Sequence, residues 1–182
     1  DSAGNIYVSG TLYNGVNGDG YFAKYNSNGK LLNSIIVNGA GNKEDAVKGM
    51  ELMNGVLYIA TVGRGSGLYD EATISAYNAS DFSPVWSKNY NSVNGDINLA
   101  GMLCDEISAD VVLAGVQGNF TKGTSDYLAL SYKASDGTQN WAKTISRGGG
   151  YNNNATAITV DISGNLLITG KTDLAGAAVD MF

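Results

Sequence analysis

Two decamers of nearly the same sequence decide the fold: DSAGNIYVSG at residues 1–10 and DISGNLLITG at residues 161–170. Two looser copies lie between them, NGVLYIATVG at residues 54–63 and ADVVLAGVQG at residues 109–118. Aligning the four copies gives spacings of 51, 54 and 55 between equivalent residues, namely Tyr7, Tyr58, Val112 and Leu167. A second series has spacings of 52 and 55, namely Tyr25, Tyr77 and Tyr132. The chain is therefore an internal repeat with a period of about 50 residues.

Each repeat is predicted to form four β-strands. Short runs rich in Val, Ile, Tyr, Thr and Leu alternate with clusters of Gly, Asn, Asp and Ser, and no segment has the periodicity of an amphipathic helix. In the second repeat the expected strands A to D are residues 45–52, 56–62, 72–78 and 85–90. Asn-Gly, Gly-Asn and Asp-Gly pairs predict tight A–B and C–D hairpins. The B–C and D–A connections, such as residues 11–20 and 147–154, are longer, so one edge of every sheet is expected to carry all the long loops.

Four-stranded antiparallel sheets at this period predict an all-β fold, a β-propeller whose sheets, or blades, bury both faces against their neighbours. The chain starts at strand B and ends in strand C, which gives about three and a third blades, an incomplete propeller. The predicted units are a part-blade at 1–37, blades at 38–90 and 91–146, and a part-blade at 147–182. Closed propellers have about 4–8 blades. The expected partners are therefore other blades of a longer parent chain, or other chains.

Two family resemblances agree with this fold. DSAGNIYVSG followed by GDGYFAKYNSNGK (residues 18–30) is similar to the bacterial seven-bladed β-propeller repeat (SBBP) family, and DISGNLLITG with the final Asp180-Met181-Phe182 resembles it again. The segment ASDGTQNW (residues 134–141) also resembles the repeats of quinoprotein-type propellers. The first resemblance implies a secreted or cell-envelope protein. The second implies a propeller with the same architecture.

Composition and charge exclude several classes of protein. Lys and Arg number 11 against 17 Asp and Glu, a net charge of −6 that argues against nucleic acids and anionic membrane surfaces as partners. The absence of His excludes imidazole general bases, the usual catalytic triads and most catalytic zinc sites. No apolar run approaches the length of about 18 residues that membrane insertion needs. The one cysteine, Cys104, follows an apolar pattern and is predicted to be a buried small hydrophobe.

An acidic residue recurs at the start of strand C, with spacings of 52, 55 and 54: Asp19, Glu71, Asp126 and Asp180. Such carboxylates are candidate Ca²⁺ ligands, together with backbone carbonyls of the Gly-rich loops. The favoured interpretation is structural, with each acid accepting hydrogen bonds from the backbone of its own loop. No Ca²⁺-binding loop motif is present, so no cofactor or metal is predicted.

Aromatic residues on the loop edge are the candidate binding residues. They sit beside Asn and Gly in the long connections, a mixture suited to protein or glycan surfaces, and they are Tyr13, Tyr69, Phe120 and Tyr151. The alternative is that each ring folds back over its own loop. Trp86 and Trp141 occupy equivalent positions in strand D, where the first repeat has Asn33, and burial between blades is favoured over sugar stacking.

Three acceptor sequons for N-glycosylation are present, at Asn78, Asn119 and Asn154. They are usable only if the protein passes through a eukaryotic secretory pathway. In a chain so rich in Asn and Ser, triplets of this kind also arise by chance.

The predicted function is a non-enzymatic, extracellular or cell-surface module that binds protein or builds an assembly through its long-loop edge. Low charge, the absence of His and the richness in Gly, Asn and Ser support it. Two alternatives remain open. One is a carbohydrate-binding propeller that uses the loop aromatics, and the other is a segment of a propeller enzyme of the quinoprotein, lyase or glycosidase kind, with carboxylate pairs such as Glu44/Asp45 and Asp70/Glu71 as candidate acid–base groups.

Overall fold

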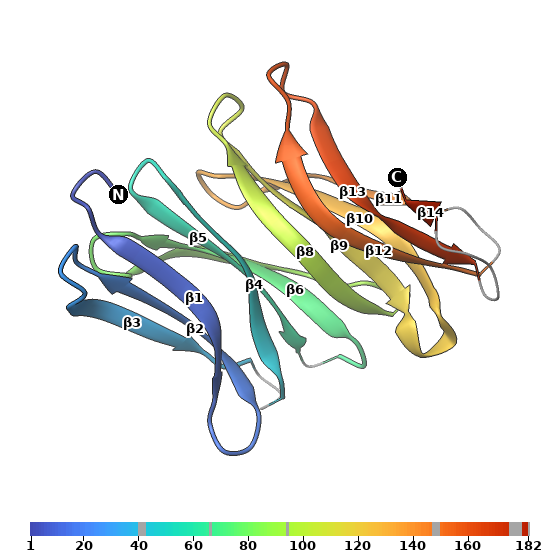
Figure 1. The fold of residues 1–182 in the computed structure, drawn as a ribbon, viewed down its shortest axis with the longest axis horizontal. Coiled ribbons are helices and arrows are strands. Elements are labelled where there is room, and N and C mark those ends of the chain that lie inside the picture. The colour runs from blue at the N-terminus through green and yellow to red at the C-terminus, as the bar shows by residue number, and fades with distance from the viewer. Residues whose placement is uncertain (40–42, 66, 94, 147–149, 175–179, 182) are drawn as a thin grey trace.

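A computed structural model describes residues 1–39, 43–65, 67–93, 95–146, 150–174 and 180–181. Strands that are consecutive in the sequence pair with one another and form the sheets, or blades (Figure 1). The first blade is β1 (Ile6–Tyr13), β2 (Gly18–Tyr25) and β3 (Leu31–Val37). The second is β4 (Asp45–Met53), β5 (Val56–Arg64), β6 (Asp70–Asn78) and β7 (Pro84–Tyr90). The third is β8 (Asp96–Asp105), β9 (Asp110–Asn119), β10 (Thr124–Lys133) and β11 (Gln139–Ile145), with a 3-10 turn at Phe120–Lys122. The fourth is β12 (Tyr151–Val160), β13 (Leu166–Leu174) and β14 (Asp180–Met181).

The predicted all-β propeller architecture is confirmed. Consecutive strands within each blade pair antiparallel, and the inner strands β4, β8 and β12 lie side by side (Figure 1). One parallel pair, Ser125 with Asn152, joins β10 to β12 and makes the third and fourth blades one continuous sheet. The blades pack face to face because the middle strands β5 and β9 are apolar on both sides, so each needs a neighbour on either face.

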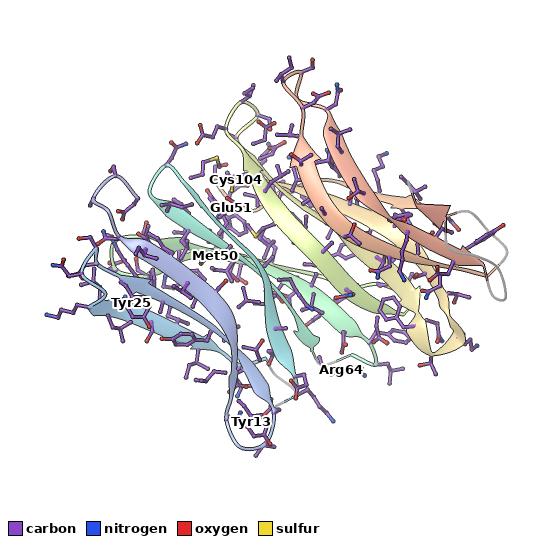
Figure 2. The ribbon with its side chains drawn as sticks, in the orientation of Figure 1. Tyr13, Tyr25, Met50, Glu51, Arg64 and Cys104 are labelled. Atoms are coloured by element: carbon purple, nitrogen blue, oxygen red, sulfur yellow. The ribbon has the colours of Figure 1, made fainter. Side chains whose placement is uncertain are left out.

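Two buried cores lie between the blades. The first core, between the first and second blades, contains Phe22, Leu57, Ile59, Ala79 and Phe82. The second core, between the second and third blades, is larger and mostly aliphatic, and includes Ile74, Ile97, Leu113, Leu128 and Leu130. Figure 2 shows side chains, Met50 among them, in the space between neighbouring sheets. Burial of apolar area on both faces of a blade is therefore what stacks the repeats.

The near-identical decamers owe their likeness to a turn. Both oxygens of the Asp161 carboxylate accept hydrogen bonds, Oδ1 from the N–H groups of Ser163 and Asn165 and Oδ2 from the Asn165 side chain. The Asp1 carboxylate makes the same pattern with residues 3 and 5. The glycine before the asparagine has φ of +76° at Gly4 and +80° at Gly164, a region that glycine enters without strain. The carboxylate thus holds a five-residue connection between two strands.

Every inner strand carries a β-bulge at the same place. The register of β4 shifts between Val47 and Gly49, that of β8 between Leu99 and Gly101, and that of β12 between Ala155 and Ala157. A bulge adds one residue and reverses the alternation of side chains beyond it. As a result Val47 and Met50, three residues apart, both pack on the first core, and Leu99 and Met102 both join the second.

The connections at the loop edge are shorter than the sequence predicts. β1 continues to Tyr13 and β2 begins at Gly18, so most of the expected 11–20 loop is strand. β12 likewise begins at Tyr151 inside the expected 147–154 loop. Antiparallel pairing uses backbone N–H and C=O groups, so Gly, Asn and Thr extend a hairpin when its partner strand is already aligned. Among the residues described, no helix is long and apolar enough to cross a membrane.

Candidate functional site

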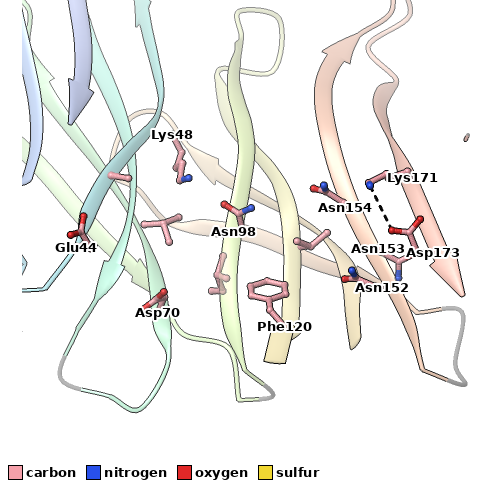
Figure 3. Close-up of a pocket in the computed structure, with 14 residues that line it drawn as sticks. Glu44, Lys48, Asp70, Asn98, Phe120, Asn152, Asn153, Asn154, Lys171 and Asp173 are labelled. Atoms are coloured by element: carbon pink, nitrogen blue, oxygen red, sulfur yellow. Dashed lines mark ion pairs between the residues drawn. The ribbon is translucent and has the colours of Figure 1, made fainter. Parts of the chain in front are cut away.

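A pocket opens where the three inner strands meet at the loop edge (Figure 3). Its volume is about 460 Å³, within the usual range of small-molecule sites, about 300–1,000 Å³. We call it the axial pocket, because the inner strands β4, β8 and β12 all contribute residues to its lining. Its polar and aromatic lining consists of Glu44, Lys48, Asp70, Asn98, Phe120, Asn152, Asn153, Asn154, Lys171 and Asp173.

The repeat geometry determines which residues line this pocket. Asn98 of β8 and Asn154 of β12 each lie two residues before the bulge of their strand, and Ala46 of β4 has the corresponding place. Lys48 is the bulge residue of β4 itself. Both asparagines and Lys48 are exposed on the pocket wall. The bulges therefore present equivalent positions of three blades to one space.

Asn153 differs from Asn152 and Asn154 because its side chain is buried in the pocket wall. It is 2% exposed, its N–H donates to Ser125 Oγ at 2.8 Å, and its side-chain N–H donates to the Ser125 carbonyl. Its Oδ1 accepts from Thr172 Oγ1 at 2.7 Å. Ser125 Oγ in turn donates to the Asn153 carbonyl at 2.6 Å. This network fixes β12 against β10 and already engages both the amide nitrogen and the amide oxygen of Asn153.

An ion-pair network borders the pocket at the second and third blades. Arg64 Nε lies 2.8 Å from Asp70 Oδ1, and Arg64 Nη2 lies 3.5 Å from Asp96 Oδ1. The Asp70 N–H donates to Asp96 Oδ1 at 2.8 Å, and the Arg64 guanidinium also donates to the Leu68 carbonyl. Arg64 therefore ties the two blades together at the loop edge, where Figure 2 also shows Tyr13.

Among the described residues, Asp173 carries the one buried side-chain oxygen or nitrogen that has no hydrogen-bond partner. Its Oδ2 lies 3.6 Å from Lys171 Nζ, as drawn in Figure 3, whereas its Oδ1 is buried and has no hydrogen-bond partner. Leaving a buried acceptor without a partner costs about 1–3 kcal/mol. Both residues come from β13, where Lys171 pairs with Asn154 of β12 and Asp173 pairs with Asn152.

Asp45 is a buried carboxyl at the start of β4, just outside the pocket lining. Burial raises the pKa of Asp45 above its ordinary value, and the nearby carboxylates Asp19, Asp70 and Glu44 raise it further. The Gly39 N–H, 2.6 Å from Oδ2, acts in the opposite direction because it favours the charged form of the carboxyl. The protonation state of Asp45 therefore depends on the charges of the neighbouring carboxylates at the loop edge.

The repeated acids of strand C are placed differently from one another. Asp19 is buried, and it accepts hydrogen bonds from the side-chain amides of Asn14 (2.8 Å) and Asn17 (3.4 Å) rather than from its loop backbone. Glu71 accepts from Asn89 of β7 at 3.4 Å, and Asp126 is half-buried in β10. The side chain of Asp180 lies outside the described residues. Nowhere in the described ranges do three or more Asp, Glu, Cys or His gather as a metal site would require.

Of the four loop-edge aromatic residues, Phe120 lines the axial pocket. Its ring, in the 3-10 turn after β9, is 38% exposed. Tyr13 is 69% exposed at the end of β1, Tyr69 is 39% exposed before β6, and Tyr151 is half-buried at the start of β12. These three belong to the same edge and do not line the pocket.

The other residues singled out by sequence have structural surroundings. Asn78 is exposed at the end of β6 and donates to Ser83 Oγ, and Asn119 caps the 3-10 turn by accepting from the Lys122 N–H. Trp86 packs against the second core, as the burial hypothesis states, and Trp141 is half-buried in β11. Burial raises the pKa of Cys104 to about 12, so the thiol stays protonated at neutral pH.

Sequence reasoning missed most of the pocket, including Lys48, Asn98, Asn152 and Asp173. The repeated decamers fall on strand B of each blade, and their spacing does not show where the inner strands bulge. A usable signal exists in the inner strands: apolar residues spaced by three, as in Val47-x-x-Met50 and Leu99-x-x-Met102, mark a bulge between them.

No model of a protein family matches the chain, and no curated protein matches it. Solved structures do. Quinohemoprotein alcohol dehydrogenase ADHIIG from Pseudomonas putida HK5 has a TM-score of 0.59 at 14% identity, with 92% of this chain and 30% of that one covered. Quinohemoprotein alcohol dehydrogenase from Comamonas testosteroni has a TM-score of 0.57 at 13% identity, with the same coverage. The chain thus spans about a third of the length of these neighbours.

These comparisons correct two expectations. The likeness supports the resemblance to quinoprotein-type propellers, and it does not extend to the SBBP family specifically. The prediction that the chain is not an enzyme is wrong by the same finding, because the structural neighbours are dehydrogenases. The absence of His led to that prediction, but it excludes only imidazole chemistry, and a propeller site can be built from carboxylates, lysines and amides.

Proposed function

We propose that the chain forms consecutive blades of a larger β-propeller enzyme and contributes three inner strands to its ligand site. The fold shared with two dehydrogenases supports the enzyme class. The axial pocket supports the position of the site, because it gathers carboxylates, ammonium groups and amides from several blades in one small volume.

The proposal of a larger propeller rests on a difference in side-chain exposure between equivalent positions of β1 and β5. Leu57 and Ile59 of β5 are each 1% exposed, because the first blade covers them. Their repeat equivalents in β1, Ile6 and Val8, are 54% and 46% exposed. The cross-strand partners are also equivalent in the repeat, since Leu57 pairs with Tyr77 and Ile6 pairs with Tyr25. The outer face of the first blade is thus built like a face that another blade covers.

The edge of β1 supports the same conclusion. β5 and β9, its equivalents, each pair with a strand on both sides. Within the described part of the chain, β1 pairs only with β2. A free edge of eight residues next to an exposed apolar face is a surface that proteins ordinarily cover.

A charged substitution tests this proposal in the intact protein. Val8→Asp is expected to lower the free energy of unfolding by more than about 2 kcal/mol, and so is Ile59→Asp, because a covered face cannot solvate a carboxylate. Ile162→Asp serves as the control, since Ile162 lies in an exposed turn, and it should change the free energy by less than about 0.5 kcal/mol. Urea unfolding gives all three values.

Two outcomes overturn the proposal. One is a Val8→Asp variant that is as stable as the Ile162→Asp control. The other is an unfolding midpoint of the unaltered protein that rises with protein concentration, because that would assign the cover of the first blade to a second molecule.

The names of the two neighbours include haem. Haem iron usually takes His, Cys, Met or Tyr as axial ligand. The chain has no His, and its one cysteine, Cys104, is a protonated thiol outside the pocket lining. The described lining of the axial pocket contains no His, Cys, Met or Tyr, so its residues do not fit a haem site.

A further inference from the structure

We infer that the axial pocket binds a neutral carbohydrate, a mono- or disaccharide, held by Asn98, Asn154 and Asp173 and stacked on Phe120. This inference rests on the proposed function, because it names the ligand class of the same pocket. It is carried by four separate properties of the lining: unused amides, an unsatisfied carboxylate oxygen, balanced charge and an exposed ring.

The first property is unused hydrogen-bonding capacity. The side-chain amides of Asn98 and Asn154 are exposed in the pocket and make no hydrogen bond to any described residue. Each amide offers a carbonyl acceptor and an N–H₂ donor. A sugar hydroxyl is both donor and acceptor, so neighbouring hydroxyls satisfy such an amide on both sides. Asn153 shows the contrast, because the wall of the pocket already occupies its amide.

The second property is the buried Oδ1 of Asp173. It accepts no hydrogen bond, although Lys171 stands 3.6 Å from the other oxygen. A turn of the Asp173 side chain brings this carboxylate to a hydroxyl donor in the pocket, and hydrogen bonds to a charged acceptor are among the stronger ones in proteins. A ligand that only accepts hydrogen bonds leaves this oxygen as it is.

The third property is charge. The lining carries three carboxylates, Glu44, Asp70 and Asp173, and two ammonium groups, Lys48 and Lys171. Asp70 is further neutralised by Arg64 at 2.8 Å. Opposite charges interspersed in this way produce no strong field of one sign, so neither an anion nor a cation is drawn in by electrostatic attraction. The lining suits a ligand that is polar and uncharged.

The fourth property is the ring of Phe120, 38% exposed at the pocket wall. Figure 3 shows it between Asn98 and Asn152. An apolar ring among amides matches a sugar, whose C–H groups form an apolar face while its hydroxyls project from the rim. The pocket volume of about 460 Å³ admits one or two sugar rings.

The test is a calorimetric titration of the protein with neutral mono- and disaccharides, with glucuronate and glucosamine as charged comparisons. We expect a neutral sugar to bind and both charged sugars to bind at least about 10-fold more weakly. Asn98→Ala and Phe120→Ala should each weaken the neutral sugar by about 10-fold or more. Tyr13→Ala is the matched control, a loop-edge aromatic outside the pocket, and should leave the affinity unchanged.

Far-UV circular dichroism of every variant shows that it is folded before it is titrated. The inference is overturned if the folded protein binds no neutral sugar at millimolar concentration, if a charged sugar binds more tightly, or if Tyr13→Ala weakens binding as much as Phe120→Ala. The larger-propeller proposal has its own readout in Val8→Asp, so the two can fail separately.

Discussion

The first and second cores share one hydrogen bond between neighbouring blades and differ in the side chains that fill them. In the first interface, Tyr7 Oη donates to the Ala79 carbonyl at 3.2 Å, and in the second, Tyr58 Oη donates to the Ala134 carbonyl at 3.2 Å. We call this contact the tyrosine latch. Each latch carbonyl accepts a second donor, which is Lys24 Nζ at 2.8 Å in one case and Trp86 Nε1 at 2.9 Å in the other.

The filling of the two cores differs more. The first core is aromatic: the ring of Phe22 lies 5.1 Å from those of both Tyr77 and Phe82. Phe82 adopts φ of +61°, which is rare for so bulky a residue, and its burial at 3% exposure holds it there. The second core is mostly leucine, isoleucine and valine from strands that face each other.

The difference teaches which parts of the repeat are interchangeable. Tyr7 and Tyr58 occupy one repeat position, and Ala79 and Ala134 both donate an N–H to the A–B turn of their own blade. Backbone geometry and the latch are therefore shared, whereas core side chains vary as long as the volume between blades is filled. The third interface uses the Ser125–Asn153 network instead, because Val112 stands where the tyrosine would be.

The largest effect is expected from Phe22→Ala. Removing a fully buried ring that contacts two others should lower the free energy of unfolding by about 3–5 kcal/mol. Phe22→Leu should cost clearly less, since it keeps most of the volume and loses only the ring contacts. Urea unfolding measures both. Equal losses for Ala and Leu would show that ring pairing, rather than filling, stabilises the first core.

A smaller effect is expected at the second latch, where two donors share one acceptor. Tyr58→Phe and Trp86→Phe should each cost about 1 kcal/mol, because the other donor still satisfies the Ala134 carbonyl. The double variant leaves that carbonyl without either donor, so its loss should exceed the sum of the two. Strict additivity in a double-mutant cycle would contradict the shared-acceptor interpretation.

The smallest effect concerns Asp45, where the first and second blades meet at the loop edge. Its pKa is raised in the folded protein, so the folded state favours the protonated carboxyl, and stability falls as pH rises through the folded pKa. Asp45→Asn removes the charge and keeps an acceptor for the Gly39 N–H. The variant should have the higher melting temperature at neutral pH.

The pH profile distinguishes this effect from a general gain in packing. Below the unfolded pKa of about 3.9 both proteins are uncharged at this position, so their melting temperatures should converge there. A difference that stays constant from acidic to neutral pH would show that the carboxylate of Asp45 is not the cause.

The fold was predictable from the sequence to a greater extent than the site. Repeat spacing, strand pattern and the hairpin turns give the propeller architecture and the strands of the second blade to within about two residues, because hydrophobic alternation and turn chemistry are local. The axial pocket depends on bulges at Lys48 and its equivalents and on how separate blades meet. Phe120 was found because aromatic residues on loops are conspicuous, whereas Asn98 and Asp173 gain their meaning only in three dimensions.

The inner-strand bulge limits where the repeat can change length. Unit lengths differ by several residues, and a change within a loop leaves the strands untouched. Deleting Lys48 would instead remove the bulge and straighten β4. The side chains on one side of the deletion, either Asp45 and Val47 or those beyond Gly49, would then point to the opposite face of the sheet. Insertions and deletions in such a chain should therefore be tolerated in the loops between blades and be destabilising in the inner strands. When blades are exchanged between related propellers, the junctions should be placed in the loops.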